Sequence, residues 1–260
     1  MSGKGNVQKI TVAGLAIEVE RRGSGRPLVL MASEEQLELE AAFVDDLAKK
    51  FEVIMPAAPG FGTSDRPDWL TNPNDLSYIM LDVIDALDLK DVTLVGFSLG
   101  GWIAAEMAIK NTSRISKLVL VDAFGVKIGG AWDRDIMDIW TSHPTKVMEA
   151  KWANPENAKR DFSVMNDDQL TVVARNMESF ARFCWSPYMH NPNLRHRLHR
   201  VTIPTLFIWG EKDGITPPAY GEAYSKLVPG AKFVTIAKAG HYPHLEATDA
   251  FMSALNGFIN

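Results

Sequence analysis

Short apolar runs recur along the chain, and apolar residues at helical spacing fill most of the intervals between them. Continuous runs of this kind are typical of strands that are buried on both faces of a parallel sheet. They lie at residues 28–31, 53–55, 92–97, 118–121, 205–209 and 233–236. Ahead of them, residues 9–20 alternate around Ala13 and Gly14, which indicates a hairpin at one edge of the sheet. The rhythm of strands and helices predicts an α/β fold, with a mostly parallel sheet covered by helices on both faces.

One long segment interrupts this alternation. Between Asp122 and Pro204 no convincing strand pattern occurs, yet the segment holds four tryptophans and five methionines. We interpret residues 125–201 as a helical cap over the strand ends, with residues 1–124 and 202–260 forming the core. Adaptable apolar side chains in such a cap predict an apolar pocket and a small substrate with a hydrophobic portion. The alternative is that these side chains pack the small core of the cap itself.

The sharpest signal is the turn that ends the run 92–97. Gly96, Ser98 and Gly100 form the pattern G-x-S-x-G, and an Ala-rich helical pattern follows immediately. Strand, tight turn and helix are the context of a nucleophile elbow, which exposes a serine hydroxyl at the top of a sheet. The glycines leave room for a strained turn, and the free amides of the following helix favour negative charge near the hydroxyl. The pattern predicts Ser98 as a nucleophile; the alternative is a serine that only caps the helix.

A serine nucleophile needs a base, and the base needs an acid that holds it in the right tautomer. His241 is the best-placed histidine because it follows the last strand directly, in a loop ahead of the final helix. Asp213 lies just past the carboxyl end of the run 205–209, at the edge of the sheet where sites form. Asp122 is the reserve candidate, although a helix cap or a hydrogen bond at the sheet rim is the favoured interpretation for it. The order Ser98, Asp213, His241 is the triad order of α/β-hydrolases.

These motifs give the chain a resemblance to the α/β-hydrolase superfamily over nearly its whole length. The segments that are similar to family signatures are 59–67, 95–101, 203–217 and 239–246. The resemblance implies an eight-stranded, mostly parallel sheet with a helical cap inserted after the sixth strand. It also implies acyl transfer to water through an acyl-serine, with no cofactor and no metal. Relatives that open epoxides or remove halogens use aspartate at the elbow, so the serine found here excludes that chemistry.

The oxyanion hole is the place where the chain departs from the family pattern. One donor is predicted to be the backbone amide of Leu99, next to the nucleophile. Family members carry His-Gly after the third strand, where Ala32 and Ser33 stand here, and the second donor is then the amide of Glu34. A carboxylate at this place would repel a developing oxyanion. The alternative is that Ser33 caps a helix while the side chains of Glu34 and Glu35 point to solvent.

Composition and charge limit the kinds of partner that we expect for this protein. The chain has 260 residues, 46% of them hydrophobic, and a net charge of −5, which argues against nucleic acid or an anionic membrane as partner. Cys184 is the only cysteine, so no disulfide can form within the chain. The chain starts without an apolar signal segment, and no run reaches the ~18 residues that span a bilayer, so we expect a cytoplasmic protein. The pattern makes no prediction of oligomeric state.

The resulting prediction is a serine hydrolase that cleaves an ester, lactone or related acyl bond. Cleavage of a carbon–carbon bond in a vinylogous diketone is a variant of the same chemistry. Two hypotheses from other classes stay open. The protein could bind a small hydrophobic ligand with little or no turnover because its oxyanion loop is altered. Alternatively, Ser98 and His241 could act as acid and base without an acyl intermediate.

Overall fold

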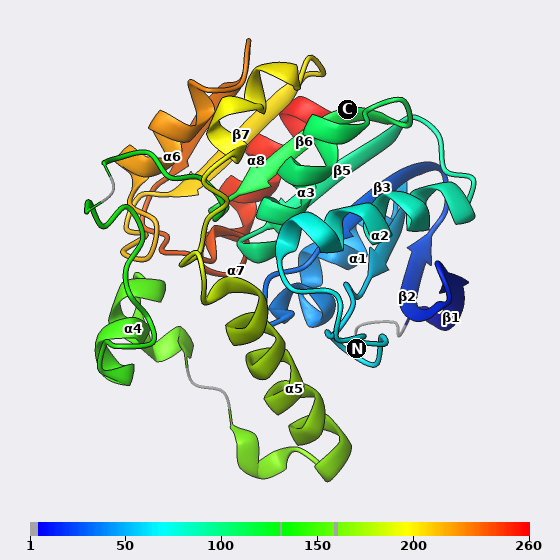
Figure 1. The fold of residues 1–260 in the computed structure, drawn as a ribbon, viewed down its shortest axis with the longest axis horizontal. Coiled ribbons are helices and arrows are strands. Elements are labelled where there is room, and N and C mark those ends of the chain that lie inside the picture. Colours follow the sequence, from blue (N-terminus) through cyan, green and yellow to red (C-terminus); the bar gives the residue numbers. More distant parts are fainter. Residues whose placement is uncertain (1–4, 131, 159–160) are drawn as a thin grey trace.

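A single twisted sheet runs through the molecule (Figure 1). The computed structural model describes residues 5–130, 132–158 and 161–260. Within them the strands are β1 (Asn6–Val12), β2 (Leu15–Gly23), β3 (Arg26–Met31), β4 (Phe51–Pro56), β5 (Val92–Phe97), β6 (Ile115–Val121), β7 (Thr205–Gly210) and β8 (Lys232–Ile236). These eight described strands lie in the order β1-β2-β4-β3-β5-β6-β7-β8. The β1–β2 and β2–β4 ladders are antiparallel and the remaining ladders are parallel, which confirms the predicted sheet.

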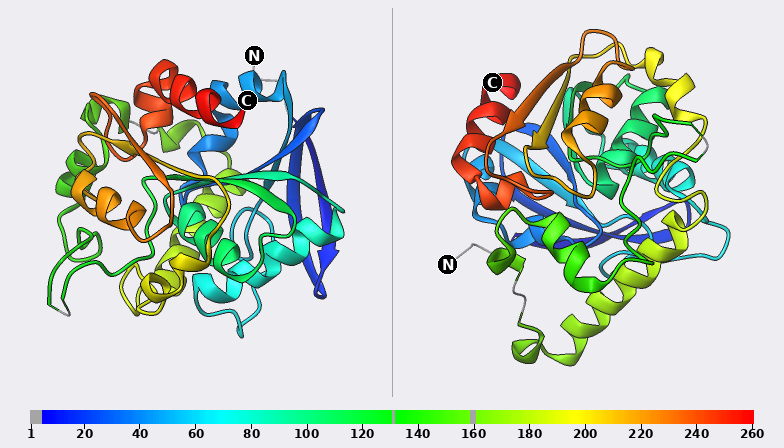
Figure 2. Two further views of the ribbon diagram at one scale, coloured as in Figure 1. Left: turned by 90° about the horizontal axis from the view of Figure 1, so that it is seen from above. Right: turned by 90° about the vertical axis from the view of Figure 1, so that its left-hand side faces the viewer.

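Helices cover both faces of this sheet. They are α1 (Ala42–Ala48), α2 (Pro73–Ala86), α3 (Leu99–Lys110), α4 (Pro144–Lys151), α5 (Asp167–Cys184), α6 (Pro218–Ser225), α7 (Pro243–Glu246) and α8 (Thr248–Ile259), with 3₁₀ turns η1 (Leu37–Glu40), η2 (Pro155–Ala158), η3 (Phe162–Val164), η4 (Leu194–His196) and η5 (Leu198–Arg200). Figure 2 shows α1, α7 and α8 on one face and α2, α3 and α6 on the other. None of the described helices is both long and apolar enough to cross a membrane.

The two faces of the sheet bury separate hydrophobic clusters. Successive residues of a strand point to opposite faces, so Leu94 and Val95 of β5 belong to different clusters. Leu94 packs in the cluster that contains Ile103 of α3 and Tyr224 of α6. Val95 packs in the cluster that contains Phe251 of α8. Because β5 is buried at every residue, it forms the rigid centre from which the following turn projects.

The chain from residue 122 to residue 204, hereafter the insertion, interrupts the alternation of strands and helices. It holds α4 and α5 and four of the 3₁₀ turns, and its described residues contain no β-strand beyond a single bridge between Gly125 and His190. Figure 1 places α4 and α5 beyond one end of the sheet. The boundaries of a separate cap at residues 125 and 201 stay a prediction.

Helix α5 is fastened to the loop that follows β4. The Oδ1 atom of Asn176 accepts a hydrogen bond from the N–H of Gly62 at 3.0 Å. The hydroxyl of Ser179 donates to the carbonyl oxygen of Gly60 at 2.7 Å. Both side chains are buried, so these bonds are shielded from water. One side of the insertion is thereby tied to the core.

The alternative in which Ser33 caps a helix is wrong. Residues 33–36 form a turn, η1 follows, and α1 begins only at Ala42. Gln36 has a φ of 55°, in the left-handed region that a helix cannot use. The N–H and the hydroxyl of Ser33 both donate to Oε2 of the buried Glu38, each at 3.0 Å. A buried carboxylate therefore organises this loop, and sequence spacing alone resembled a helix cap.

Candidate active site

Ser98 lies in a sharp turn between β5 and α3. Its φ of 51° and ψ of −115° form a combination that residues other than glycine rarely adopt. A Cβ atom on Gly96 would lie 2.5 Å from the carbonyl oxygen of Gly100. A Cβ atom on Gly100 would lie 2.2 Å from the carbonyl oxygen of Met31. Both positions therefore need glycine, because neither backbone oxygen leaves room for a methyl group.

The close approach at Gly100 leads to a stability prediction. Gly100→Ala is expected to lower the free energy of unfolding by about 3 kcal/mol, because the new methyl group overlaps backbone atoms. Gly257→Ala in α8 is the matched control, since a Cβ atom there meets nothing within 4 Å. Alanine in place of a helical glycine adds about 0.5–1 kcal/mol. Urea unfolding measures both variants, and equal stability of the two would contradict the close approach.

Three side chains from distant parts of the chain meet beside the turn. The Ser98 Oγ atom lies 2.9 Å from Nε2 of His241, and Nδ1 of His241 lies 2.8 Å from Oδ2 of Asp213. Asp213 also accepts hydrogen bonds from the N–H groups of Ile215 and Thr216 and from the Thr216 hydroxyl. The exposed fractions of the three residues that meet are only 1–3%. The arrangement has the contacts that an alcohol, a base and an orienting acid require.

The insertion helps to hold His241 in place. The backbone N–H of His241 donates to the carbonyl oxygen of Lys151, the last residue of α4, at 2.7 Å. The imidazole stacks on Phe124 with the ring centroids 5.3 Å apart. Phe124 in turn stacks on Phe180 of α5. Both helices of the insertion therefore contribute to the position of the imidazole.

Asp122, the reserve candidate for the acid, lies close to Asp213. Its Oδ1 atom accepts a hydrogen bond from the N–H of Gly210 at 2.9 Å, which links the ends of β6 and β7 as the sheet-rim interpretation predicts. Its Oδ2 atom is buried and has no hydrogen-bond partner among the described residues. Asp122, Asp213 and His241 also offer ligand atoms within 4.8 Å of one another, a spacing that suits a metal ion. The expectation of a metal-free site stays a prediction.

The buried carboxyl of Asp122 makes stability depend on pH. Burial, and after it the charge of Asp213, raises the pKa of Asp122 well above its ordinary value of 3.8. The folded state therefore holds this proton more tightly than the unfolded state, and the free energy of unfolding falls as the pH rises above about 4.

Asp122→Asn has no such proton to lose and keeps the carbonyl oxygen that accepts from Gly210. We expect the variant to gain stability relative to the wild type as the pH rises from about 4 to 7. Thermal melts at three pH values in this range measure the difference. A difference that is constant with pH would contradict the role given to Asp122.

The residues predicted to supply the oxyanion donors, Leu99 and Glu34, both neighbour Ser98. Leu99 opens α3, so its amide has no acceptor within the helix. The side chain of Glu34 does not point to solvent: it is 4% exposed, and its Oε2 atom lies 2.8 Å from Ser98 Oγ. The solvent-facing alternative is therefore wrong for Glu34. As a result, the Ser98 hydroxyl has two short polar contacts, one to His241 and one to Glu34.

Lys151 of the insertion completes this cluster. Its Nζ atom lies 3.4 Å from Oε1 of Glu34 and contacts Oε1 of Glu35 and the hydroxyl of Tyr242. The Tyr242 hydroxyl donates to the same oxygen of Glu35 at 3.0 Å. Burial lowers the pKa of Lys151, but the charges of Glu35 and Glu34 outweigh burial and raise it to about 12. Lys151 therefore stays a cation at neutral pH.

Sequence reasoning identified neither Lys151 nor the side-chain role of Glu34. The available signal was the pair of acids, Glu34 and Glu35, that directly follows Ala32 and Ser33, the two residues that replace His-Gly of the family pattern. Carboxylates that become buried need a cation, and that cation comes from a helix more than a hundred residues away along the chain. No spacing rule links these positions.

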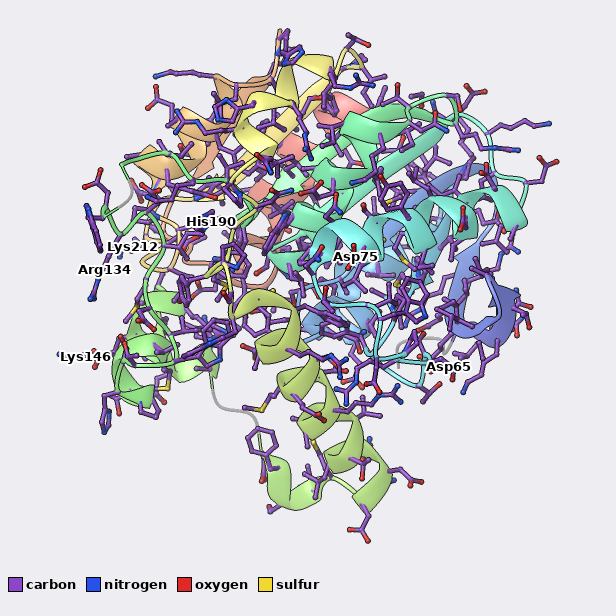
Figure 3. All side chains as sticks on the ribbon, viewed as in Figure 1. Asp65, Asp75, Arg134, Lys146, His190 and Lys212 are labelled. Atoms are coloured by element: carbon purple, nitrogen blue, oxygen red, sulfur yellow. The ribbon has the colours of Figure 1, made fainter. Side chains whose placement is uncertain are left out.

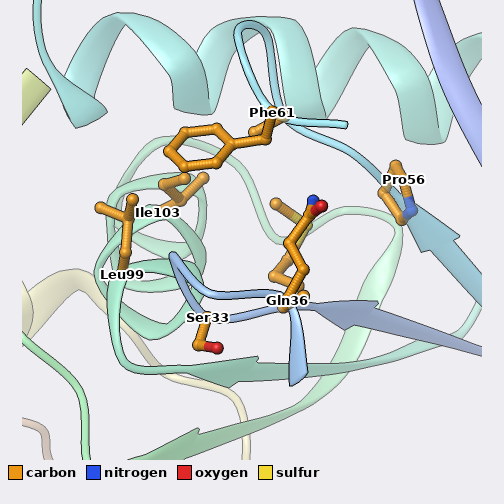
Figure 4. A pocket seen from close by; sticks show the side chains of 9 residues that line it. Ser33, Gln36, Pro56, Phe61, Leu99 and Ile103 are labelled. Atoms are coloured by element: carbon orange, nitrogen blue, oxygen red, sulfur yellow. The ribbon is translucent and has the colours of Figure 1, made fainter. Parts of the chain in front are cut away.

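A cavity of about 10 Å³ lies beside Leu99, with Phe61 and Ile103 on the same side and Gln36 and Pro56 opposite (Figure 4). This volume holds about one water molecule.

A larger groove of about 680 Å³ lies between η1 and α5. Its apolar lining consists of Leu37, Leu39, Trp152, Ala158, Val164, Met165, Val172, Val173 and Leu245.

Other histidines have structural contacts. His244 is buried, and its Nε2 atom lies 3.1 Å from Oε1 of Glu38, so it supports the loop after β3. His190 lies on the chain that returns from α5 towards the core (Figure 3), and its Nδ1 atom lies 2.7 Å from the carbonyl oxygen of Tyr188. Neither ring contacts Ser98 in the part of the chain that is described.

Comparison with known proteins shows the family to which the chain belongs. A family model with the description "Alpha/beta hydrolase family" matches residues 32–254. The chain belongs to the alpha/beta hydrolase family. This hydrolase is similar to the pimeloyl-[acyl-carrier protein] methyl ester esterase of Legionella pneumophila (strain Paris), with 26% identity over 94% of this chain and 99% of the relative. It is also similar to the 2-hydroxymuconate semialdehyde hydrolase of Pseudomonas sp. (strain CF600), with 27% identity over 97% and 93% of the two chains.

Solved structures share the fold of this hydrolase. A meta-cleavage product hydrolase from Pseudomonas fluorescens IP01 has a TM-score of 0.78 at 20% identity and is covered over 97% of both chains. A hydrolase from Pseudomonas aeruginosa PA01 has a TM-score of 0.75 at 25% identity, with 100% of both chains covered. The predicted fold and the assignment as a hydrolase are therefore confirmed.

Proposed function

We propose that this hydrolase cleaves an ester, lactone or related acyl bond of a small substrate through an acyl-serine intermediate on Ser98. The observation that carries the proposal is the unbroken line of contacts from the Ser98 hydroxyl through His241 to Asp213, at 2.9 and 2.8 Å. A serine hydroxyl is a weak nucleophile until a base takes its proton. The Asp213 carboxylate favours the imidazole tautomer whose Nε2 atom can accept that proton.

In the proposed reaction, Ser98 Oγ attacks the carbonyl carbon while His241 Nε2 takes the hydroxyl proton. The carbonyl oxygen becomes an oxyanion, and we assign the amides of Leu99 and Glu34 as its donors. The intermediate collapses when His241 gives its proton to the leaving group, which departs and leaves the acyl group on Ser98. Water then attacks the acyl carbon while His241 takes a proton from it. The bond between the acyl carbon and Ser98 Oγ breaks, His241 returns the proton to Oγ, and the carboxylic acid leaves.

The groove between η1 and α5 supports a substrate with an apolar portion. Most of the side chains that line its 680 Å³ on the insertion side are apolar, including Trp152, Met165 and Val172. Trp152 directly follows Lys151, whose ammonium contacts Glu34 beside the nucleophile. A substrate could therefore lie in the groove with its reactive carbonyl near Ser98. Pockets of this size and lining are typical of sites for small molecules.

The bond type is proposed on chemical grounds. One relative's name specifies a methyl ester and the other a semialdehyde. Hydrolysis of an ester needs only a proton for an oxygen leaving group, which His241 can supply. Cleavage of a carbon–carbon bond needs a proton at carbon as well, so it demands more of the site. We therefore place esters and lactones first and diketones second.

Labelling with a fluorophosphonate tests the proposal. The purified protein is treated with the reagent, and peptide mass spectrometry locates the adduct. In parallel, a panel of p-nitrophenyl esters, lactones and vinylogous diketones is assayed for hydrolysis. An adduct on Ser98 together with turnover of at least one substrate is expected. No adduct and no turnover would favour a ligand-binding protein, for which the contact of Glu34 with Ser98 is the supporting observation.

A further inference from the structure

Ser98 Oγ has one hydroxyl proton and two neighbours that can accept it. His241 Nε2 lies at 2.9 Å and Glu34 Oε2 at 2.8 Å. A proton that points to one acceptor is not available to the other. In this arrangement the Glu34 carboxylate competes with the base for the nucleophile's proton.

A carboxylate so close to Ser98 also opposes acyl transfer. The oxyanion forms on the carbon that bonds to Ser98 Oγ, so it develops within a few ångströms of the Glu34 side chain. Two negative charges at that separation repel strongly in a water-poor site. Glu34 is 4% exposed, so solvent screens this repulsion little. The carboxylate must therefore leave Ser98 before the oxyanion forms.

The ammonium of Lys151 offers the Glu34 carboxylate an alternative partner to the Ser98 hydroxyl. Its ammonium already lies 3.4 Å from Oε1 of Glu34, longer than a normal charge-assisted hydrogen bond. A rotation of the Glu34 side chain towards Lys151 would shorten this contact and break the one to Ser98. The backbone of the loop is held separately, because Ser33 donates twice to Glu38. The movement therefore needs only the side chain of Glu34.

We propose that Glu34 restrains the nucleophile: its carboxylate holds the Ser98 hydroxyl in the substrate-free enzyme and moves onto Lys151 when an acyl group binds. This inference rests on the proposed function, because it takes Ser98 as the nucleophile. The proton of the hydroxyl passes to His241 as before, and Glu34 neither gains nor loses one. Lys151 matters to the reaction only while a carboxylate stands at position 34.

The rate of labelling by a small fluorophosphonate tests the proposal. Four proteins are compared: the wild type, Glu34→Gln, Lys151→Met and the double variant. Glu34→Gln is expected to label at least about tenfold faster, because the competing charge is gone. Lys151→Met is expected to label at least about tenfold slower, because the Glu34 carboxylate loses the cation onto which it would move when it leaves Ser98. The double variant is expected to label as fast as Glu34→Gln.

Glu222→Gln is the matched control. It removes a carboxylate that pairs with a lysine, Lys226 at 2.8 Å, and it touches none of Ser98, Glu34 and Lys151 among the described contacts, so it is expected to change the rate by less than about threefold. Melting temperatures establish that each variant is folded, and Lys151→Gln replaces Lys151→Met if the latter unfolds.

Labelling of Glu34→Gln at or below the wild-type rate would overturn the inference. An equal effect of Lys151→Met with and without Glu34 would also overturn it, since Lys151 would then act only on structure. Absence of labelling in all variants, including the wild type, would instead remove the proposed function itself.

Discussion

Ser98→Ala is expected to lower kcat for the best substrate of the panel by about 10⁶-fold, the scale on which a serine–histidine–aspartate unit fails when its nucleophile is removed. The hydroxyl is the only part of Ser98 that the substitution removes. The turn itself stays, because the Ser98 N–H donates to the carbonyl oxygen of Val121 and the glycines remain. The loss therefore reports the chemistry of the hydroxyl. Initial rates at high enzyme concentration measure it.

Ser225→Ala is the control for this substitution. Its hydroxyl donates to the carbonyl oxygen of Glu222 within α6 and touches neither His241 nor Asp213. Its kcat should equal that of the wild type. Turnover by Ser98→Ala within tenfold of the wild type would mean that the reaction proceeds without an acyl-serine.

Asp213→Asn is expected to lower kcat by about 10⁴-fold. The Oδ1 atom accepts from two backbone amides, at Ile215 and Thr216, so the carbonyl oxygen of asparagine takes this place. The amide nitrogen then faces His241 and donates to Nδ1. The imidazole must carry its proton on Nε2 instead, where it can no longer accept the proton of Ser98. Stopped-flow or initial-rate measurements with a p-nitrophenyl ester give the loss.

Asp122→Asn discriminates between the two candidate acids. Asp122 bonds to Gly210 rather than to the imidazole, so its variant is expected to keep kcat within about tenfold of the wild type. A loss in Asp122→Asn as large as that in Asp213→Asn would assign the acid to Asp122.

Local rules were sufficient for the sheet and for the meeting of three side chains. β5 and β7 are buried along their whole length, so their apolar runs could be recognised without tertiary information. Parallel strands end at one edge of the sheet, which brings the residues that follow β5, β7 and β8 together. Ser98, Asp213 and His241 follow these three strands, and their side chains are in contact.

The rest of the site depends on contacts that spacing does not encode. The sequence allowed Ser33 to cap a helix, but its hydroxyl donates to the buried Glu38 instead, and α1 begins only at Ala42. The Glu34 side chain points inwards because of the conformation of that loop and because it contacts Lys151, which lies at the end of α4 in the insertion. Neighbours in sequence show only that Glu34 and Glu35 are two consecutive acidic residues, and acidic residues are usually exposed to solvent.

The hydrogen bond from the His241 amide to the Lys151 carbonyl oxygen has a mechanical consequence. Gly214 donates in the same way to the carbonyl oxygen of Ala150. The end of α4 thus holds both the loop of the imidazole and the loop of its acid. A displacement of α4 would disturb both loops at once, so the position of this one helix and the alignment of the imidazole with its acid are mechanically coupled.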